Sequence, residues 1–326
     1  MGKKDRCSIG FDLGGTKMLA KVYGSEFRRL GQARTKTKGY EGSKAGVNRI
    51  IKTIKEAMSE AKVDAEQLTS IGIGCPGPLD LDKGVIRSSA NLGWTNVPIK
   101  DKLEEEFGCP TVVLNDVDAG VYGEYRFGAA KGARTAVGVF PGTGIGGGCV
   151  YDGHILRGKS ASCMEIGHIQ VDPSGPMCGC GKRGCLEAVA SRLVIASQVA
   201  AAAYRGQAPY LLKSVGTDLQ NIRSGALANS VEHGDKQVEL IVREAARQIG
   251  IGVANVVNLM APDVVVLGGG LVKAMPKLYV GEVAESANSR VIDTMVDSFK
   301  VVAAELGDDA SVMGAAAWAK QSLGQD

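Results

Sequence analysis

Two segments of the chain alternate apolar and polar residues around glycine-rich turns. Residues 8–23 do so on both sides of Gly14 and Gly15, and residues 135–151 do so around a glycine-rich stretch at 142–148. Alternation with a period of two on either side of such a turn is typical of a β-hairpin. The sequence therefore predicts one hairpin at the start of the chain and a second near its middle.

Apolar residues recur every three or four positions in residues 43–62 and again in 235–259, which predicts an amphipathic helix in each segment. Short apolar runs between polar residues predict buried strands. The other expected helices cover 98–107, the Ala- and Val-rich region up to about 207, and 311–319, and the expected strands cover 70–74, 111–114 and 264–267.

These strands and helices fall into two blocks, and each block opens with a glycine hairpin. Mixed strands and helices in this arrangement predict two α/β domains of related build. We expect a smaller first domain over residues 1–118, joined by the C-terminal helix at about 308–326. The larger second domain is expected over residues 119–307.

Composition and charge narrow the possible functions. Glycine makes up 45 of the 326 residues, about twice its usual share of roughly 7%, without the three-residue period of collagen. The net charge is +3 with no run of five like charges, so neither nucleic-acid binding nor membrane-surface binding is expected. We expect no membrane-spanning stretch and no secretory signal, and therefore a cytoplasmic protein.

Two nucleotide-binding patterns occur in unsuitable surroundings. Residues 153–160 match the Walker A pattern, but the loop holds bulky residues and no amphipathic helix follows Ser160. Residues 142–147 match the GxGxxG pattern, which needs a following helix to hold a pyrophosphate, whereas a strand is expected there. The sequence therefore predicts neither a P-loop nor a Rossmann fold.

The two glycine turns, taken together, suggest another way to bind a nucleotide. Each turn presents backbone N–H groups without side-chain obstruction, and two facing loops would grip one triphosphate from both sides. A third glycine run follows the strand at 264–267, and a set of ordinary turns is the alternative. The residues assigned to the nucleotide are Asp12, which would hold Mg²⁺ directly or through water, and Gly14, Gly15, Thr16, Lys17, Gly142, Thr143, Gly144, Gly268, Gly269 and Gly270.

Three of the eight cysteines lie within eight residues of one another. With the preceding histidine they form the pattern His168-x₉-Cys178-x-Cys180-x₄-Cys185. One imidazole and three thiolates satisfy a tetrahedral Zn²⁺ and leave no open position for water, so a structural zinc site is predicted. A glycine-rich loop with incidental thiols is the alternative.

The order of these motifs resembles a known family. The landmarks are the loop at 12–17, Leu-Asn-Asp at 114–116, the glycine loop at 142–148, Glu-Ile-Gly-His at 165–168, the cysteine cluster through Glu187, the glycines from 268 and the segment 306–317. With them, nearly the whole chain resembles the ROK family of sugar kinases. The resemblance implies the actin-like ATPase fold (hexokinase-type and ribonuclease H-like), with two domains around a cleft.

The resemblance also implies a reaction, the transfer of the γ-phosphoryl group of ATP, with Mg²⁺, to the 6-hydroxyl of glucose. It places the general base at Asp116, for which a helix N-cap is the alternative role. For Asn91 and the nearby Trp94, a turn with a packed aromatic side chain is an equal alternative to sugar contact. The implied sugar-binding residues are Asn91, Asn115, Asp116, Glu165, His168 and Glu187.

Some alternatives stay open within the resemblance. An N-acetylhexosamine, mannose or fructose could replace glucose, and polyphosphate could replace ATP. Cys163 and Met164 stand where the family usually has a small Ala-Gly pair, so we expect a narrowed or reshaped sugar pocket. A sugar-responsive regulator would need a DNA-binding domain before the first hairpin, and an actin-like filament protein would not need the cysteine cluster. A homodimer that binds a sugar and a nucleotide is expected.

Overall fold

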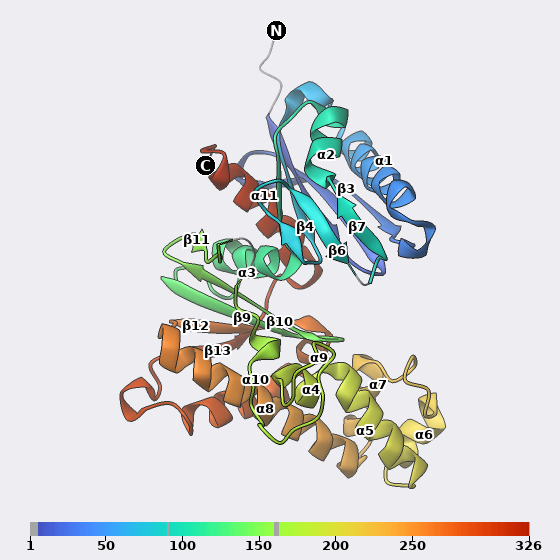
Figure 1. Ribbon diagram of the computed structural model, residues 1–326, viewed down its shortest axis with the longest axis vertical. Helices are drawn as coiled ribbons and strands as arrows, with labels where there is room; N and C mark the ends of the chain where they lie inside the picture. The colour runs from blue at the N-terminus through green and yellow to red at the C-terminus, as the bar shows by residue number, and fades with distance from the viewer. Residues whose placement is uncertain (1–5, 90, 160–162, 326) are drawn as a thin grey trace. The chain divides into compact units, whose positions relative to one another are not determined.

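The computed structural model describes residues 6–89, 91–159 and 163–325. Strands and helices alternate along the chain, which divides into two compact units (Figure 1). Unit 1 comprises the described residues of Met1–Gly132, Gly153–Cys163 and Asp308–Asp326, and unit 2 comprises those of Ala133–Asp152 and Met164–Gly307. The sequence predicted a division near residue 118, a position that lies within the unit 1 helix α3 (Asp116–Phe127).

A five-stranded sheet in the order β3-β2-β1-β4-β8 forms the framework of unit 1. The first predicted hairpin is present, because β1 (Cys7–Leu13) pairs antiparallel with β2 (Lys17–Tyr23), and β3 (Arg29–Lys36) extends it. β4 (Leu68–Cys75) pairs in parallel with β1 and with β8 (Thr111–Asn115). The carboxyl ends of three parallel strands therefore lie at one edge of the sheet, the usual place for ligands in α/β proteins.

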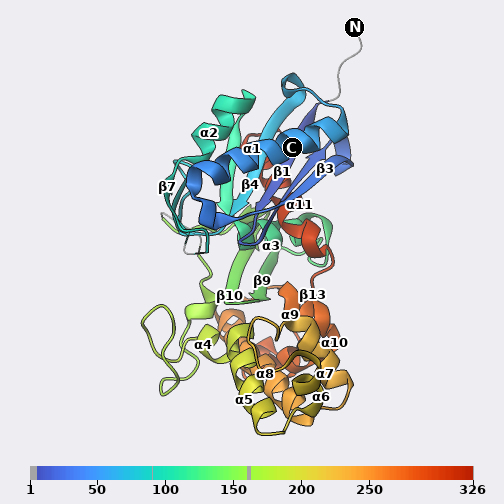
Figure 2. The same ribbon diagram turned by 90° about the vertical axis from the view of Figure 1, so that its right-hand side faces the viewer.

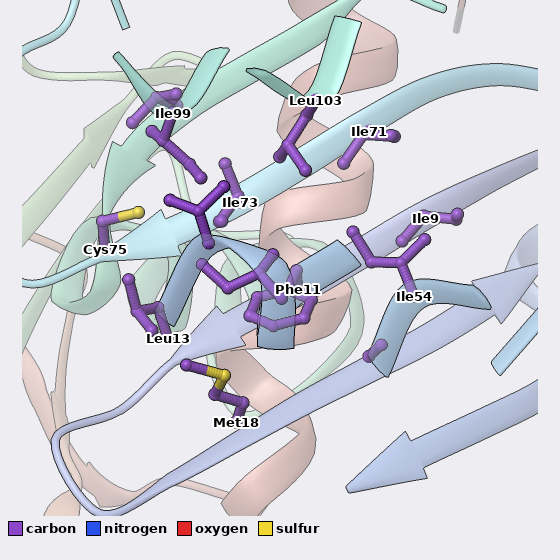
Figure 3. Close-up of a cluster of buried hydrophobic side chains, with 14 of the residues drawn as sticks. Ile9, Phe11, Leu13, Met18, Ile54, Ile71, Ile73, Cys75, Ile99 and Leu103 are labelled. Atoms are coloured by element: carbon purple, nitrogen blue, oxygen red, sulfur yellow. The ribbon is translucent and has the colours of Figure 1, made fainter. Parts of the chain in front are cut away.

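One face of the unit 1 sheet is covered by α1 (Ser43–Ala61) and α2 (Ile99–Phe107), as Figures 1 and 2 show. Odd-numbered residues of β1, such as Ile9 and Phe11, point toward these helices because side chains alternate along a strand. They form a buried core with Ile54 of α1 (Figure 3). This core explains the helical spacing of apolar residues in α1.

The opposite face carries α11 (Ala310–Ser322), which packs on β1 and β4. Glycines in the two strands let the helix backbone lie directly on the sheet. A Cβ atom at Gly10 would lie 1.9 Å from the carbonyl oxygen of Val312, and one at Gly72 would lie 1.9 Å from that of Ala315. Part of the glycine excess therefore serves helix–sheet packing.

A separate three-stranded antiparallel sheet completes unit 1. It consists of β5 (Leu79–Asp80), β6 (Val85–Ser89) and β7 (Trp94–Val97). The Trp94 side chain is buried against α1, where a Cβ atom at Gly46 would lie 1.9 Å from the indole ring. Trp94 is therefore a core residue.

The second predicted hairpin forms the centre of the unit 2 sheet. β9 (Thr135–Pro141) pairs antiparallel with β10 (Ile145–Tyr151) and in parallel with β12 (Val264–Leu267), which is followed at the edge by β13 (Lys300–Ala303). β11 (His154–Ile155) follows β10 along the chain. The helices of unit 2 are α4 (Leu186–Ala190), α5 (Arg192–Tyr204), α6 (Pro209–Val215), α7 (Ser224–Glu232), α8 (Lys236–Met260), α9 (Gly269–Ala274) and α10 (Pro276–Asn288).

One segment of the described chain, Leu186–Tyr204, is long and apolar enough by composition to cross a membrane. It is the one weak candidate among the described residues, and the expectation that the chain has no membrane-spanning stretch is not overturned by it. In the structure, extended backbone at Ser191 divides the segment into α4 and α5, of 5 and 13 residues. Both helices pack against α8 inside unit 2, which accounts for their apolar residues.

Candidate functional site

Two carboxylates come together at the carboxyl edge of the unit 1 sheet. Asp12 lies near the end of β1, and its Oδ1 accepts a hydrogen bond from Ser311 Oγ of α11 at 3.1 Å. Asp116 begins α3 directly after β8. Gly74 of β4 lies between them, because a Cβ atom there would be 3.0 Å from Ser311 Oγ and 3.4 Å from the Cα of Asp116. A glycine in the middle strand therefore keeps this space open.

The environment of these carboxylates disfavours their charged forms. Burial, reinforced by the negative charge of Asp116, raises the pKa of Asp12 to about 6. Burial also raises the pKa of Asp116, against the opposing effect of the Val117 N–H. Carboxylate oxygens are ligands that Mg²⁺ prefers, and a cation would relieve the repulsion between the two groups. A carboxylate of raised pKa is also a stronger base than an exposed one.

Asp12→Asn is expected to stabilise the protein above about pH 6. The pKa of Asp12 is about 6 in the folded chain, against about 3.9 in an unfolded chain, so its ionisation destabilises the fold by up to about 3 kcal/mol. This cost is fully present above pH 6 and disappears as the pH falls toward 4. Urea unfolding at pH 8 and pH 4.5, without added divalent cations, measures it.

The matched control is Asp101→Asn, which removes an exposed carboxylate from the first turn of α2. Its effect should stay within about 0.5 kcal/mol at either pH. A destabilised Asp12→Asn variant at pH 8, or a gain that does not shrink at lower pH, would contradict the expected cost of burying this charge.

The first glycine turn is held in a defined conformation. The N–H of Gly14 donates to the carbonyl oxygen of Lys17 at 3.1 Å, while Thr37 Oγ1 donates to the Gly14 carbonyl at 2.6 Å. A Cβ atom at Gly14 would lie 2.8 Å from the Lys17 carbonyl oxygen, so the turn requires glycine there. Gly15, Thr16 and Lys17 are exposed, which leaves the turn accessible to a ligand.

The Lys17 ammonium group already has an anionic partner in unit 1. Its Nζ lies 2.8 Å from Asp308 Oδ2, and Arg34 Nη2 lies 3.1 Å from the same oxygen. All three side chains are about half exposed. Because exposed ion pairs are weak, Lys17 could exchange this carboxylate for a phosphate at little cost.

The N-cap of α3 is Asn115, whose Oδ1 accepts hydrogen bonds from the N–H groups of Val117 at 2.8 Å and Asp118 at 3.3 Å. Asp116 is the first residue inside the helix. Its Oδ1 also accepts from the Val117 N–H, at 3.0 Å. The alternative role of Asp116 as the N-cap is therefore wrong, because Asn115 occupies that position.

Asn91 lies in the turn that connects β6 to β7, and its side chain is exposed. The turn is closed by backbone bonds from the N–H groups of Leu92 and Gly93 to the carbonyl oxygen of Ser89. Among the described residues, no hydrogen bond joins Asn91 to another predicted site residue. A sugar contact by Asn91 stays a prediction.

The four predicted metal ligands gather in unit 2. The Nδ1 of His168 lies 3.7 Å from the Sγ of Cys178, and the Sγ atoms of Cys180 and Cys185 lie 3.6 Å apart. One ligand atom from each residue falls within 4.8 Å of the others. Tetrahedral Zn²⁺, with bonds of about 2.3 Å to sulfur and 2.0 Å to nitrogen, spaces its ligand atoms about 3.5–3.8 Å apart. The donor set and its spacing therefore fit zinc.

The predicted sugar-binding residues of unit 2 lie around this cluster. Glu165 is exposed and directly precedes the short 3₁₀ helix Ile166–His168. Glu187 follows Cys185 in α4, and its Oε1 lies 3.9 Å from Cys178 Sγ. Its other carboxylate oxygen, Oε2, accepts the N–H of Ile145 at 2.9 Å. Glu187 thus connects the cysteine cluster to the second glycine turn, a contact that sequence spacing did not indicate.

The third glycine run in unit 2 packs on the end of β9, directly before the second glycine run. The second run closes on itself, with the N–H of Gly142 donating to the carbonyl of Gly144 at 2.8 Å. A Cβ atom at Gly268 would lie 2.3 Å from the ring of Phe140, and one at Gly269 would lie 2.6 Å from the carbonyl oxygen of Pro141. Gly270 follows within α9, and Thr143 is exposed. The sequence assigned both loops to one nucleotide but did not predict this packing between their segments.

The rejected nucleotide patterns have no helix where one is needed. The second glycine run connects β9 to β10, so the GxGxxG pattern is followed by a strand, as predicted. The described part of the Walker A match contains the two-residue strand β11 and no helix, and Ser160 lies outside the described residues. Neither segment has P-loop or Rossmann architecture.

Met164 has an unusual backbone conformation. Its φ is +63°, in the left-handed region that favours glycine, and the cost for another residue is about 1 kcal/mol or more. Its carbonyl oxygen accepts the N–H of Ile166 at 2.6 Å and would lie 2.4 Å from a Cβ atom at Gly147. Met164 stands where the ROK family, which this chain resembles, usually has a glycine. The substitution therefore places backbone strain directly before Glu165.

Sequence reasoning missed two residues that hold the site loops. Ser311 bonds to Asp12, although only its place in the segment 306–317 drew attention to it. Arg192 Nη2 donates to Thr143 Oγ1 at 2.8 Å. It stands in an Ala- and Val-rich helix with no recognised motif, and no sequence signal could have connected it to a loop about fifty residues earlier.

Comparison with known proteins agrees with this arrangement. The ROK family model matches residues 8–322. A glucokinase of Thermotoga maritima is 33% identical over 97% of this chain and 98% of its own length. The crystal structure of a ROK family glucokinase from Streptomyces griseus, in complex with glucose and AMPPNP, has a TM-score of 0.82 at 32% identity, over 97% of this chain and 99% of that one. A ROK hexokinase structure from Thermus thermophilus has a TM-score of 0.82 at 33% identity, over 98% and 100% of the two chains. The predicted actin-like ATPase fold is thereby confirmed.

Proposed function

This chain belongs to the ROK family, and from that premise we propose that it is an ATP-dependent kinase that phosphorylates the 6-hydroxyl of glucose. The observation that carries the proposal is the Asp116 carboxylate, partly buried and of raised pKa, beside Asp12 at the carboxyl edge of parallel strands. The likeness to glucokinases extends over nearly the entire chain and supports glucose as the sugar.

Asp116 is assigned the role of general base. The 6-hydroxyl oxygen of the sugar attacks the γ-phosphorus in line, its proton passes to the Asp116 carboxylate, and ADP leaves. Burial supports this role because it makes the carboxylate more basic. The N–H of Val117 holds Oδ1 at 3.0 Å, which fixes the side chain on the first turn of α3.

The glycine loops are assigned to the nucleotide. The backbone N–H of Gly15 and the side chains of Thr16 and Lys17 would hold phosphate oxygens in unit 1, at the turn that Gly14 shapes through its own N–H bond to the Lys17 carbonyl. In unit 2, the adjacent second and third glycine runs would do the same. Asp12 is the carboxylate that would hold Mg²⁺, which neutralises phosphate charge when it is bound.

The cysteine cluster is assigned to a structural Zn²⁺. His168, Cys178, Cys180 and Cys185 would occupy all four tetrahedral positions, so the metal would fix the loop and leave no place for a reacting water. Glu165, His168 and Glu187 would then present fixed acceptors and donors to sugar hydroxyls, with Asn91, Asn115 and Asp116 in unit 1. Each wrong pairing of a buried hydroxyl would cost about 1–3 kcal/mol, which discriminates among hexoses.

We place the enzyme in the cytoplasm as a homodimer whose partners are a small sugar and a nucleotide. The near-neutral charge of +3, without a basic cluster in the sequence, supports neither nucleic acid nor membrane surface as a partner.

A panel of sugars tests the substrate assignment. ADP release from ATP should depend on added sugar, with the highest kcat/KM for glucose and lower values for mannose, fructose and N-acetylglucosamine. Polyphosphate in place of ATP examines the alternative donor. A higher kcat/KM for N-acetylglucosamine than for glucose would move the assignment to another sugar while keeping the kinase reaction.

A further inference from the structure

Arg192 is bonded twice to the second glycine turn. Its backbone N–H donates to the carbonyl oxygen of Gly142 at 2.9 Å, and its Nη2 donates to Thr143 Oγ1 at 2.8 Å. Arg192 is the first residue of α5, whose N-cap is Ser191. The turn is held from its other side by the bond from the Ile145 N–H to Glu187 Oε2. Helices α4 and α5 thus hold both ends of the turn at Gly142–Ile145.

The Arg192 guanidinium is a cation with unused donors. It carries five N–H groups, and within the described part of the chain only the bond to Thr143 engages its side chain. The ion pairs of the described residues include no carboxylate partner for it. The first turn of α5 contains no acidic residue, and the N-terminal end of a helix is itself positive. Among the described residues, the guanidinium therefore forms no ion pair, and the nearby Glu187 carboxylate is engaged by the Ile145 N–H.

The hydrogen bond from Arg192 also determines what the hydroxyl proton of Thr143 can do. Because Thr143 Oγ1 accepts a hydrogen bond from Arg192, its own O–H is left to donate to another acceptor. Thr143 is exposed on the turn, two residues after Pro141, whose carbonyl oxygen would lie 2.6 Å from a Cβ atom at Gly269 of the third run. The threonine hydroxyl and the guanidinium therefore form a pair of neighbouring donors that suits one phosphate group.

We propose that Arg192 binds a β- or γ-phosphate oxygen of the nucleotide at the Gly142–Gly144 turn, together with the Thr143 hydroxyl. This inference rests on the proposed function, since it assigns a further residue to the same nucleotide. It adds a fixed cation to a turn whose other donors are backbone N–H groups and one hydroxyl. A charged donor on the β- or γ-phosphate would favour ATP and ADP over AMP.

Two variants separate this role from simple support of the turn. Arg192→Gln keeps an N–H donor for Thr143 but removes the charge, and Arg192→Lys keeps the charge but loses the planar pair of donors. Calorimetric titration of the full chain with AMP, ADP and AMPPNP measures binding without turnover. We expect Arg192→Gln to weaken AMPPNP binding by roughly 10- to 100-fold, Arg192→Lys to weaken it less, and AMP and glucose affinity to stay within about twofold.

The matched control is Arg205→Gln, which removes the same charge from the exposed C-terminal end of α5 and should leave every affinity unchanged. Unchanged AMPPNP binding in Arg192→Gln would overturn the inference, and so would an equal loss of AMP binding, which would indicate collapse of the turn.

Glucose-dependent ADP release by the unaltered protein is measured alongside these titrations. If that activity is present while Arg192→Gln binds AMPPNP normally, only this inference fails; if the unaltered protein neither binds nucleotide nor releases ADP, the proposed function fails with it.

Discussion

Asp116→Asn is expected to lower kcat by about 10²- to 10⁴-fold while glucose still binds. Asparagine has nearly the same shape, and its side-chain oxygen can still accept the Val117 N–H that now bonds to Asp116 Oδ1. It has no basic oxygen to take the proton of the attacking hydroxyl. Steady-state ADP release gives the loss in kcat, and calorimetric titration with glucose gives the affinity.

The control for this variant is Asp101→Asn, which removes an exposed carboxylate from α2 and should leave kcat within about twofold. Thermal unfolding of both variants confirms that each remains folded. A kcat within tenfold of the unaltered enzyme in Asp116→Asn would remove Asp116 from the role of base. Loss of glucose binding with an unchanged kcat would instead make it a sugar ligand alone.

Loss of the cysteine cluster is expected to have the second large effect. Cys178→Ser and Cys185→Ser each replace a buried thiolate ligand, and we expect the zinc content to fall from one ion per chain to near zero. Loss of a structural metal belongs with the most destabilising changes, above about 4 kcal/mol, which lowers Tm by roughly 6 °C or more in a chain of this size. Metal analysis and thermal unfolding measure the two effects.

Cys163→Ser is the matched control, because Cys163 lies outside the cluster and donates its Sγ–H to the carbonyl of Leu156, a bond that serine can replace. It should keep the zinc and nearly all of the stability. Glucose affinity should fall in the cluster variants, since His168 and Glu187 stand on the loop that the proposed metal would fix. Full zinc content in both cluster variants, or full stability after zinc is lost, would contradict a structural metal.

The framework of the fold could be predicted because its elements have strong local patterns. Alternation around Gly14 predicts β1 and β2, and helical spacing predicts α1 and α8 nearly to their ends. The missed elements have weak patterns for physical reasons. β3 is a largely polar edge strand, and α10 packs on α8 through small residues, where a Cβ atom at Gly250 would lie 2.4 Å from that of Ser286.

The site could be predicted where a residue ends a strand or repeats a ligand spacing. Asp12 lies near the end of one parallel strand and Asp116 follows another, and the cysteine spacing brings three thiols into one loop. Contacts between distant segments could not be predicted. The glycines at Gly10 and Gly72, which admit α11 to the sheet, have no distinguishing sequence context. The bond from Arg192 to Thr143 likewise exists only because the chain folds.

The most direct test of the central claim is the sugar-dependent release of ADP with glucose and with 6-deoxyglucose, which lacks only the proposed attacking hydroxyl. The account predicts rapid ADP release with glucose, a product that ³¹P and ¹³C NMR identify as glucose 6-phosphate, and no stimulation by 6-deoxyglucose. Equal stimulation by the two sugars, phosphate at another carbon of glucose, or no glucose-dependent ADP release would contradict it.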